Sequence, residues 1–365
     1  MSGFGCTLRR EEQAVFTLRE LYESYGYRPY KMSKFEEYDL YVRNKEFLIS
    51  DGVITFTDTD GKLMALKPDV TLSIIKNSRD EAGCVQKVYY NENVYRVSED
   101  AHCFKEILQT GLECMGDIDD GCVYEVLRLA AESLRSVAPR AVLDVSHLGV
   151  VDSLLTAVSA EGRKAVCHCL GEKNAHELAQ VCAAYGVAED TAAALQQLVN
   201  LYGTPDKVIP ALKALVGDTE AAATLEKLTA AMIADGYGDM VRIDFSVVDE
   251  GSYYNGIVFR GFAEGVPDSV LSGGQYHRLM RQMGRRGGAV GFAVYLDRLE
   301  RIPEANLPYD VDTLLLYDEG CDLTALYAAA DALRQEGGVM LQKEIPQNLT
   351  YRRLCRFENG EVTTL

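Results

Sequence analysis

Long apolar segments are missing from this sequence. No stretch reaches the roughly 18 uninterrupted apolar residues that a membrane-crossing helix requires. The first residues, MSGFGCTLRREEQAVFTLRELY, carry charges throughout and contain no apolar region like that of a secretory signal. We therefore expect a cytoplasmic protein without membrane contact.

Basic residues are few relative to acidic ones. The 365 residues include 37 Lys and Arg against 55 Asp and Glu, and the formal net charge is −18. Such a negative protein repels a phosphate backbone, which disfavours a general nucleic-acid binder, although a local basic groove remains open. With 47% hydrophobic residues the chain can bury a large core, and its length indicates two or three folding units.

The usual signatures of nucleotide binding and hydrolysis are also absent. The sequence has no Walker A loop, no GxGxxG turn, no HExxH and no GxSxG. Its ten cysteines follow no disulfide framework, so we interpret them as free thiols. In the tightest group, CHCLGEKNAH, one residue separates the two cysteines, and this spacing suits zinc poorly. We expect neither a metal nor a cofactor.

Helical and strand patterns both occur, which predicts an α+β protein. Residues 9–25 place apolar side chains on one helical face. Residues 52–68 alternate apolar and polar side chains around DTDG and predict a hairpin. Residues 84–97 and 105–117 predict two further strands, so an antiparallel sheet with helices on it is expected. Residues 289–299, AVGFAVYLDRL, are predicted to form a helix entered from glycines.

Changes in composition divide the chain. Between residues 150 and 236, Ala, Leu and Glu recur with helical period, which predicts a helical insertion. The flanking regions, residues 1–149 and 237–302, are predicted to form one core. A proline-containing linker follows, and residues 303–365 predict a reduced C-terminal β-α-β unit with a polar, weakly patterned tail after Pro346.

Several polar residues fall on or beside the predicted strands. Asp69 and Thr71 follow the hairpin, Arg96 ends one strand, and Gln109 and Glu113 lie on the next. Because Gln109 and Glu113 are four residues apart on a strand, their side chains point to the same face. A carboxylate beside an amide suits an ammonium or imidazolium ligand. Any one of these residues alone is more typical of the solvated face of an antiparallel sheet.

Five segments in this order resemble the catalytic core of histidyl-tRNA synthetase, a class II aminoacyl-tRNA synthetase. They are FTDTDGKLMALKPDVT, NENVYRVSEDAHCFKEILQTGLE, YYNGIVFRGF, SGGQY and AVGFAVYLDRL. The resemblance covers roughly residues 9–301. It implies a class II synthetase-like antiparallel sheet flanked by helices, and the predicted helical insertion also fits that family.

The resemblance implies a pocket for histidine. In that family the matching positions meet the ammonium, imidazole and carboxylate groups of the amino acid, with Tyr253 supporting Tyr254. Arg96 matches the arginine of motif 2, which contacts the carboxylate. The residues implied to bind histidine are Asp69, Thr71, Arg96, Gln109, Glu113, Tyr253 and Tyr254.

The nucleotide side departs from the family. Synthetases have Arg-Gly-Leu-Asp before the tyrosine pair, where this chain has DEGS at residues 249–252. Loss of one group that stabilises developing charge costs about 10²–10³ in rate, and a carboxylate in its place is expected to cost more. We interpret Lys105, Asp249 and the motif 3 arginine, Arg298, as remnants of a nucleotide site. No catalytic residue is expected.

The C-terminal region departs as well. The synthetase has a complete α/β domain there that reads the anticodon, whereas the residues left in this chain predict one β-α-β unit and a tail. Together with the negative charge, this small unit predicts no tRNA partner.

A synthetase core that keeps histidine contacts but loses ATP and tRNA contacts resembles the regulatory-subunit family of ATP phosphoribosyltransferase. That resemblance implies a non-catalytic subunit of histidine biosynthesis, which activates a short-form catalytic subunit and mediates feedback inhibition by L-histidine. It also implies a dimer within a hetero-oligomer. Two alternatives remain open: a functional histidyl-tRNA synthetase, and a synthetase-like amino-acid-sensing module with another partner.

Overall fold

The chain forms two compact units, Met1–Ile302 and Pro303–Leu365. Each unit has its own sheet and its own apolar core. Within the described ranges, no helix combines the length and apolar character needed to cross a membrane. The computed structural model describes residues 9–45, 48, 52–79, 81–97, 103–248, 253–299, 301 and 309–365.

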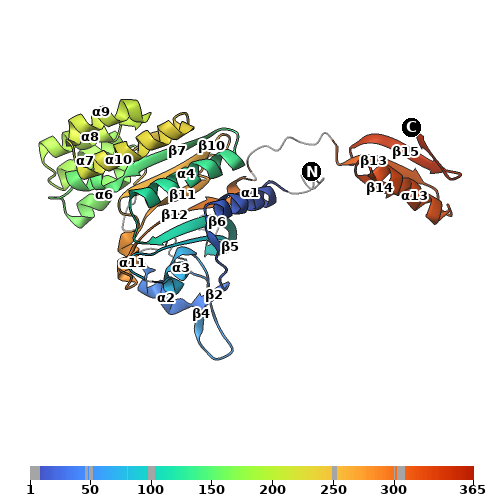
Figure 1. Cartoon of the computed structure of the whole chain (residues 1–365), viewed down its shortest axis with the longest axis horizontal. Coiled ribbons are helices and arrows are strands. Elements are labelled where there is room, and N and C mark those ends of the chain that lie inside the picture. Colours follow the sequence, from blue (N-terminus) through green and yellow to red (C-terminus); the bar gives the residue numbers. More distant parts are fainter. Residues whose placement is uncertain are drawn as a thin grey trace. The chain divides into compact units, whose positions relative to one another are not determined.

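A nine-stranded sheet organises the first unit (Figure 1). Most neighbouring strands are antiparallel, and the parallel pairs are β1 with β5 and β7 with β9. In spatial order the strands are β1 (Arg28–Pro29), β5 (Val85–Val97), β6 (Phe104–Gly116), β12 (Gly288–Tyr295), β11 (Leu271–Gln275), β10 (Ile257–Ala263), β7 (Ala141–His147), β9 (Val241–Asp244) and β8 (Tyr202–Gly203).

The prediction of a helix over residues 289–299 is wrong. This segment forms the central strand β12, paired with β6 and β11, and the helix that follows, α12, is only Leu296–Leu299. Val290, Phe292 and Val294 face the larger core, and Gly291 and Ala293 lie on the opposite face. A strand covered on both faces has an apolar run without polar alternation, which periodicity alone does not distinguish from a buried helix.

Helices α1 (Arg10–Ser24) and α4 (Asp120–Val137) cover one face of the sheet. Tyr22 of α1 packs edge-on against Phe292 of β12, with ring centroids 6.0 Å apart. The Tyr22 hydroxyl lies 3.0 Å from Ser133 Oγ of α4, so this buried polar atom has a partner. These helices belong to the larger apolar core and leave the opposite face of the strands for shorter elements.

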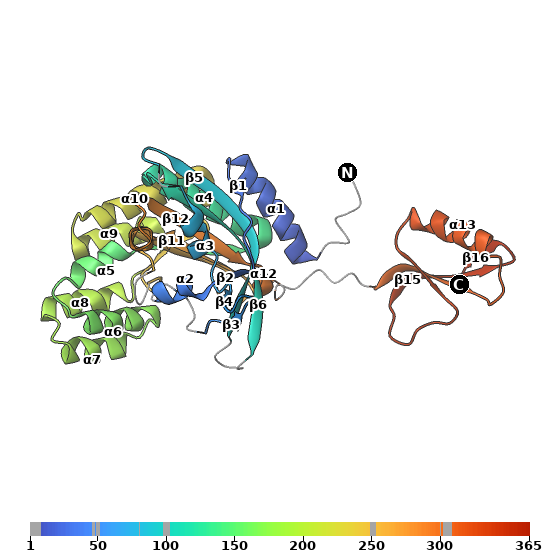
Figure 2. The ribbon, with the colours of Figure 1, turned by 90° about the horizontal axis from the view of Figure 1, so that it is seen from below.

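The opposite face carries a small sheet and short helices (Figures 1 and 2). The predicted hairpin at DTDG is confirmed: the Asp58 carboxylate accepts hydrogen bonds from the backbone N–H groups of Asp60 and Lys62, at 2.9 and 2.8 Å. Gly61 allows this turn with a φ of +81°. The elements are β2 (Phe35–Glu37), β4 (Leu63–Leu66) and β3 (Thr55–Thr57), with α2 (Tyr38–Arg43), α3 (Thr71–Asn77) and α11 (His277–Gln282).

Six helices and a π-helical turn lie between β7 and β9 in the sequence, and Figure 2 shows α6 to α9 gathered beyond one end of the sheet. The side chains of Ser159, Asn174 and Thr219 cap three of them, each accepting a hydrogen bond from the backbone N–H three residues later. Helical period predicts these helices but not β8, which pairs with β9. The bounds are α5 (Leu148–Leu154), α6 (Ala160–Gly171), α7 (Ala175–Ala184), α8 (Glu189–Leu198), α9 (Pro205–Val216), α10 (Glu220–Met232) and η2 (Ile233–Tyr237).

Between residues 309 and 365, the second unit forms a four-stranded sheet with one helix. Leu315, Leu326, Ala330, Cys355 and Phe357 form its core. The unit is larger than a β-α-β arrangement, because the tail for which no element was predicted forms the hairpin β15–β16. In spatial order the strands are β14 (Val339–Gln342), β13 (Val311–Tyr317), β15 (Tyr351–Glu358) and β16 (Glu361–Thr364), and α13 is Leu323–Arg334.

Candidate functional site

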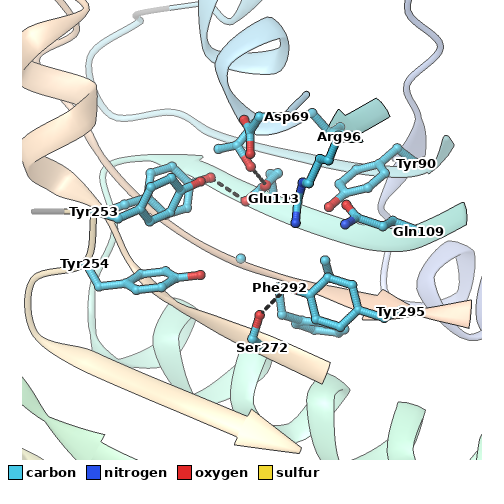
Figure 3. A pocket seen from close by; sticks show the side chains of 15 residues that line it. Asp69, Tyr90, Arg96, Gln109, Glu113, Tyr253, Tyr254, Ser272, Phe292 and Tyr295 are labelled. Carbon is cyan, nitrogen blue, oxygen red and sulfur yellow. Dashed lines mark hydrogen bonds between the residues drawn. The ribbon is translucent and has the colours of Figure 1, made fainter. Parts of the chain in front are cut away.

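A pocket opens in the first unit on the face of the sheet opposite α1 and α4 (Figure 3). Strands β5, β6, β11 and β12 contribute to it, together with the β4–α3 connection and the segment before β10. The space between its side chains, measured out to the mouth, is about 410 Å³.

All seven residues that the sequence predicts to bind histidine line this one pocket. Gln109 and Glu113 do share a face of β6, as their spacing predicts, and only 4% and 2% of their surfaces are exposed. The other contributions are Asp69 and Thr71 from the β4–α3 connection, Arg96 from β5, and Tyr253 and Tyr254 from the segment before β10.

Two hydroxyl groups hold the Glu113 carboxyl group. Thr71 Oγ1 donates to Glu113 Oε1 at 2.7 Å, and the Tyr276 hydroxyl donates to Glu113 Oε2. Burial raises the pKa of Glu113 from 4.5 to about 8; the two hydroxyl hydrogen bonds oppose this rise, and the charge of Asp69 adds to it. Near neutral pH a cationic ligand would therefore shift Glu113 toward its ionised form.

Asp69 supplies a second buried carboxyl group. Its Oδ1 accepts a hydrogen bond from the backbone N–H of Leu72 at 2.9 Å, which fixes the carboxyl group at the start of α3. Burial raises the pKa of Asp69, while the Leu72 N–H and the positive charge of Arg96 oppose the rise. Two carboxyl groups in one small pocket create a site for a positively charged group.

Arg96 extends from β5 toward the middle of the pocket (Figure 3). Its Nε donates to the Pro68 carbonyl at 3.3 Å, which leaves the terminal nitrogens directed at the pocket. A guanidinium in this position can pair with a ligand carboxylate through two parallel hydrogen bonds.

A buried ion pair fixes the segment that carries Asp69. Lys67 is 0% exposed, and its Nζ lies 2.7 Å from Glu92 Oε2 on β5. The Lys67 carbonyl also accepts a hydrogen bond from the backbone N–H of Tyr95 at 2.9 Å. These contacts tie the β4–α3 connection to β5. They therefore hold Asp69 and Arg96 at fixed positions relative to each other.

Tyrosines form one wall of the pocket. The rings of Tyr253 and Tyr254 pack edge-on with centroids 4.7 Å apart, and Tyr253 and Tyr276 lie 5.8 Å apart. Burial raises the pKa values of Tyr90, Tyr253 and Tyr276 well above 10. Their hydroxyls therefore stay neutral and can both donate and accept hydrogen bonds.

Gly291 of β12 makes room for Glu113. A Cβ atom at position 291 would overlap Glu113 Oε2 and would also crowd the Leu112 carbonyl, 2.5 Å away. A larger residue would displace the carboxyl group from its two hydroxyl donors. The position of Glu113 thus depends on the absence of a side chain on the neighbouring strand.

The predicted remnants of a nucleotide site do not gather in the pocket. Lys105 is exposed near the start of β6, directly opposite Arg96 in the strand register, and does not line the pocket. Arg298 on α12 lies over the ring of Tyr295, 4.4 Å from its centre, and donates to the Ser269 carbonyl. Asp249 lies outside the described residues, as do residues 250–252.

Several pocket residues were not predicted from the sequence. The SGGQY segment contains Ser272 and Tyr276, but its strand pattern did not indicate which side chains face a ligand. The residues from β12 were missed because a helix was predicted there. One signal was available: β12 pairs with β6, so its residues at every second position share a face with Glu113. The additional lining residues are Val70, Tyr90, Ser272, Tyr276, Gly291, Phe292, Ala293 and Tyr295.

The chemistry of the lining suits a small zwitterion. Two carboxyl groups can receive an ammonium group, Arg96 can receive a carboxylate, and Gln109 and the tyrosines can bond a polar ring. Within the described ranges, no group of three or more His, Cys, Asp or Glu residues could hold a metal ion. None of the nine cysteines in those ranges forms a disulfide bond.

Comparison with known proteins agrees with the resemblance to histidyl-tRNA synthetase and to the regulatory subunits. The family described as histidyl-tRNA synthetase matches residues 6–299. The ATP phosphoribosyltransferase regulatory subunit of Oceanobacillus iheyensis is 25% identical over 345 residues, which cover 91% of this chain and 84% of the relative. The subunit of the same name from Caldanaerobacter subterraneus subsp. tengcongensis is 28% identical over 335 residues, covering 88% and 87%.

Solved structures share the fold. A Bacillus halodurans chain, described as an ATP phosphoribosyltransferase regulatory subunit/histidyl-tRNA synthetase, matches with a TM-score of 0.77 and 23% identity, over 95% of this chain and 93% of its own. A chain of the ATP phosphoribosyl transferase complex of Thermotoga maritima matches with a TM-score of 0.62 and 18% identity, over 77% and 96%. The predicted α+β synthetase-like fold is confirmed.

Proposed function

The chain belongs to the histidyl-tRNA synthetase family, and from this we propose that it is a regulatory subunit of ATP phosphoribosyltransferase that binds L-histidine. The observation that carries the proposal is the single pocket lined by all seven predicted histidine-binding residues. The names of its relatives support the regulatory role, because curated subunits of that name match most of the chain.

Each group of histidine has a partner in this pocket. The α-ammonium meets a carboxylate and the Gln109 amide, and the carboxylate meets Arg96. The imidazole ring lies against Tyr254 and bonds Glu113. Two buried carboxyl groups and one guanidinium match the charges of an amino acid with a basic ring. A larger apolar ligand would leave these three charged groups unpaired.

We infer that this chain performs no chemistry of its own. Adenylation concentrates negative charge on phosphate groups, which catalysts stabilise with several cations. In the described part of the chain, Arg96 is the one cationic side chain that lines the pocket. Arg298 is engaged by Tyr295 and Ser269, and Lys105 lies outside the pocket.

Regulation then works by linkage between two sites. Histidine bound in the pocket changes the equilibrium of the catalytic partner through a protein interface, with a coupling of about 1–3 kcal/mol. We further propose a cytoplasmic hetero-oligomer in which this subunit dimerises. Within it, residues 1–149 and 237–302 act as the core, 150–236 as a helical insertion and 303–365 as a separate unit.

Reconstitution tests the proposal directly. The full chain is mixed with a short-form ATP phosphoribosyltransferase catalytic subunit, and turnover is followed while L-histidine is titrated. We expect turnover to rise on mixing and to fall as histidine is added, and light scattering to give the mass of a hetero-oligomer. Unchanged turnover together with no sensitivity to histidine contradicts the proposal, as does charging of tRNA by the purified chain.

A further inference from the structure

A tyrosine closes one end of the pocket. Tyr295, the last residue of β12, lines the pocket and is 8% exposed. Its hydroxyl lies 2.6 Å from Ser272 Oγ on the neighbouring strand β11. Figure 3 shows this pair on the side away from Tyr253, with Arg96 reaching into the space next to it.

Behind the ring of Tyr295 stands a guanidinium. Arg298 lies over the ring, 4.4 Å from its centre, donates to the Ser269 carbonyl and lies 3.4 Å from Ser269 Oγ. Tyr295 lines the pocket and Arg298 does not, so the ring separates the guanidinium from any ligand. The position of Tyr295 is therefore fixed from two sides, by Ser272 and by Arg298.

Arginine guanidinium groups stack on aromatic faces, whether these belong to a side chain or to a base. Here the chain supplies the aromatic face itself. A nucleoside attached to the carboxyl group of a ligand at Arg96 would run toward this end of the pocket. To enter, it would have to displace the Tyr295 ring, which breaks the contacts with Ser272 and Arg298 and exposes a buried ring.

We propose that Tyr295 is the specificity-determining residue of the pocket: it admits a free amino acid and excludes the same amino acid when a nucleoside extends from its carboxyl group. The inference rests on the proposed histidine site and deepens it. A regulatory subunit with this closure responds to the free amino acid and not to its activated, nucleotide-linked form.

A matched pair of ligands tests the closure. Histidine amide is the unextended ligand, and the extended one is the amide of histidine with 5′-amino-5′-deoxyadenosine, which has no phosphate for an acidic residue to repel. Calorimetry on the full chain is expected to give at least about tenfold weaker binding of the extended ligand. The Tyr295→Ala variant is expected to remove most of that difference, whereas Tyr295→Phe, which keeps the ring, is expected to retain it.

Equal binding of the two ligands by the unmodified chain overturns the inference, and so does a ratio that Tyr295→Ala leaves unchanged. Tyr295→Ser is the second variant if Tyr295→Ala does not fold. Absence of histidine binding to the unmodified chain is a separate result that rejects the proposed function. In that case adenosine alone still tests the closure, because saturable binding to the unmodified chain contradicts it, and binding gained only in the Ala variant supports it.

Discussion

Thr71 at the start of α3 donates a 2.7 Å hydrogen bond to Glu113 in the middle of β6. The bond joins two parts of the pocket lining, the start of α3 and strand β6, and holds the Glu113 carboxyl group in place. Because Glu113 is 2% exposed, loss of its partners would leave a buried polar group unpaired.

Glu113→Gln is expected to weaken L-histidine binding and to leave the fold intact. An amide cannot take the negative charge that pairs with a cationic ligand, and such charge-assisted hydrogen bonds contribute about 1.5–3 kcal/mol. The expected loss is therefore about tenfold to 150-fold in Kd, measured by calorimetry. Glu264→Gln is the matched control, since that carboxyl group is exposed and pairs with Arg140 on the surface. Unchanged affinity in Glu113→Gln would remove this residue from the site.

Stability without ligand is expected to fall as pH rises from about 5 to about 8. The pKa of Glu113 is about 8 in the folded chain and 4.5 without burial, so the folded state keeps a proton that the unfolded state has lost. The contribution of neutral Glu113 is complete below pH about 4.5 and is lost as pH rises through about 8. Urea unfolding of the unmodified chain and of Glu113→Gln isolates this effect, because Asp144, whose pKa is raised to about 7, is common to both. Parallel pH profiles for the two proteins would contradict the assignment.

Lys67→Met is expected to destabilise the first unit by about 3–5 kcal/mol, because it leaves Glu92 without its buried partner. It should also weaken histidine binding, since the Lys67–Glu92 pair ties the Asp69 segment to β5. The double variant Lys67→Met/Glu92→Leu should recover part of the stability, and a double-mutant cycle from urea unfolding measures the coupling. Additive effects of the two single changes would exclude a direct interaction.

Gly291→Ala is expected to abolish or strongly weaken histidine binding. The added Cβ overlaps Glu113 Oε2, so the carboxyl group must leave its hydroxyl donors. Gly171→Ala serves as the control, because a Cβ there meets Val248 at an ordinary 3.6 Å. Calorimetry and thermal melting are compared for both variants. Full affinity in Gly291→Ala would mean that Glu113 does not need this position.

Removal of residues 303–365 is expected to leave histidine binding unchanged. All residues that line the pocket lie in the first unit, and the second unit has its own core. The fragment 1–302 should melt cooperatively and bind histidine with the same Kd as the full chain. A folded fragment with lost affinity would assign the second unit a part in the site.

The sequence predicted the acidic side of the pocket better than its tyrosine-closed end. Gln109 and Glu113 are polar residues four positions apart on β6, and because side chains alternate along a strand, both were predicted to lie on the same face. On β12, by contrast, Val290, Phe292 and Val294 face one core while glycine and alanine face the other side, so no polar residue marks the alternation. Because β12 was predicted to be a helix, Gly291 and Tyr295 were not predicted to line the pocket.

The hairpin β15–β16 of the second unit was also not predicted from the sequence. Its tail, which was predicted to be polar and weakly patterned, contains Arg352, Arg353 and Arg356. In the structure these arginines pair with Asp312, Glu336 and Asp318, while Cys355 and Phe357 between them enter the core. Long charged side chains on β15, which lies between β13 and β16, hide a short apolar alternation, because their partners lie elsewhere in the sequence.

The pocket takes residues from positions 69 to 295, and its central strands β6 and β12 are separated in sequence by the whole helical region. During synthesis the chain therefore lacks a complete ligand site until it has been extended past Tyr295. A chain that ends before Tyr295 lacks the β12 part of the pocket lining, however well its first strands have folded. The proposed response to histidine can therefore begin only after β12 has been synthesised and has paired with β6.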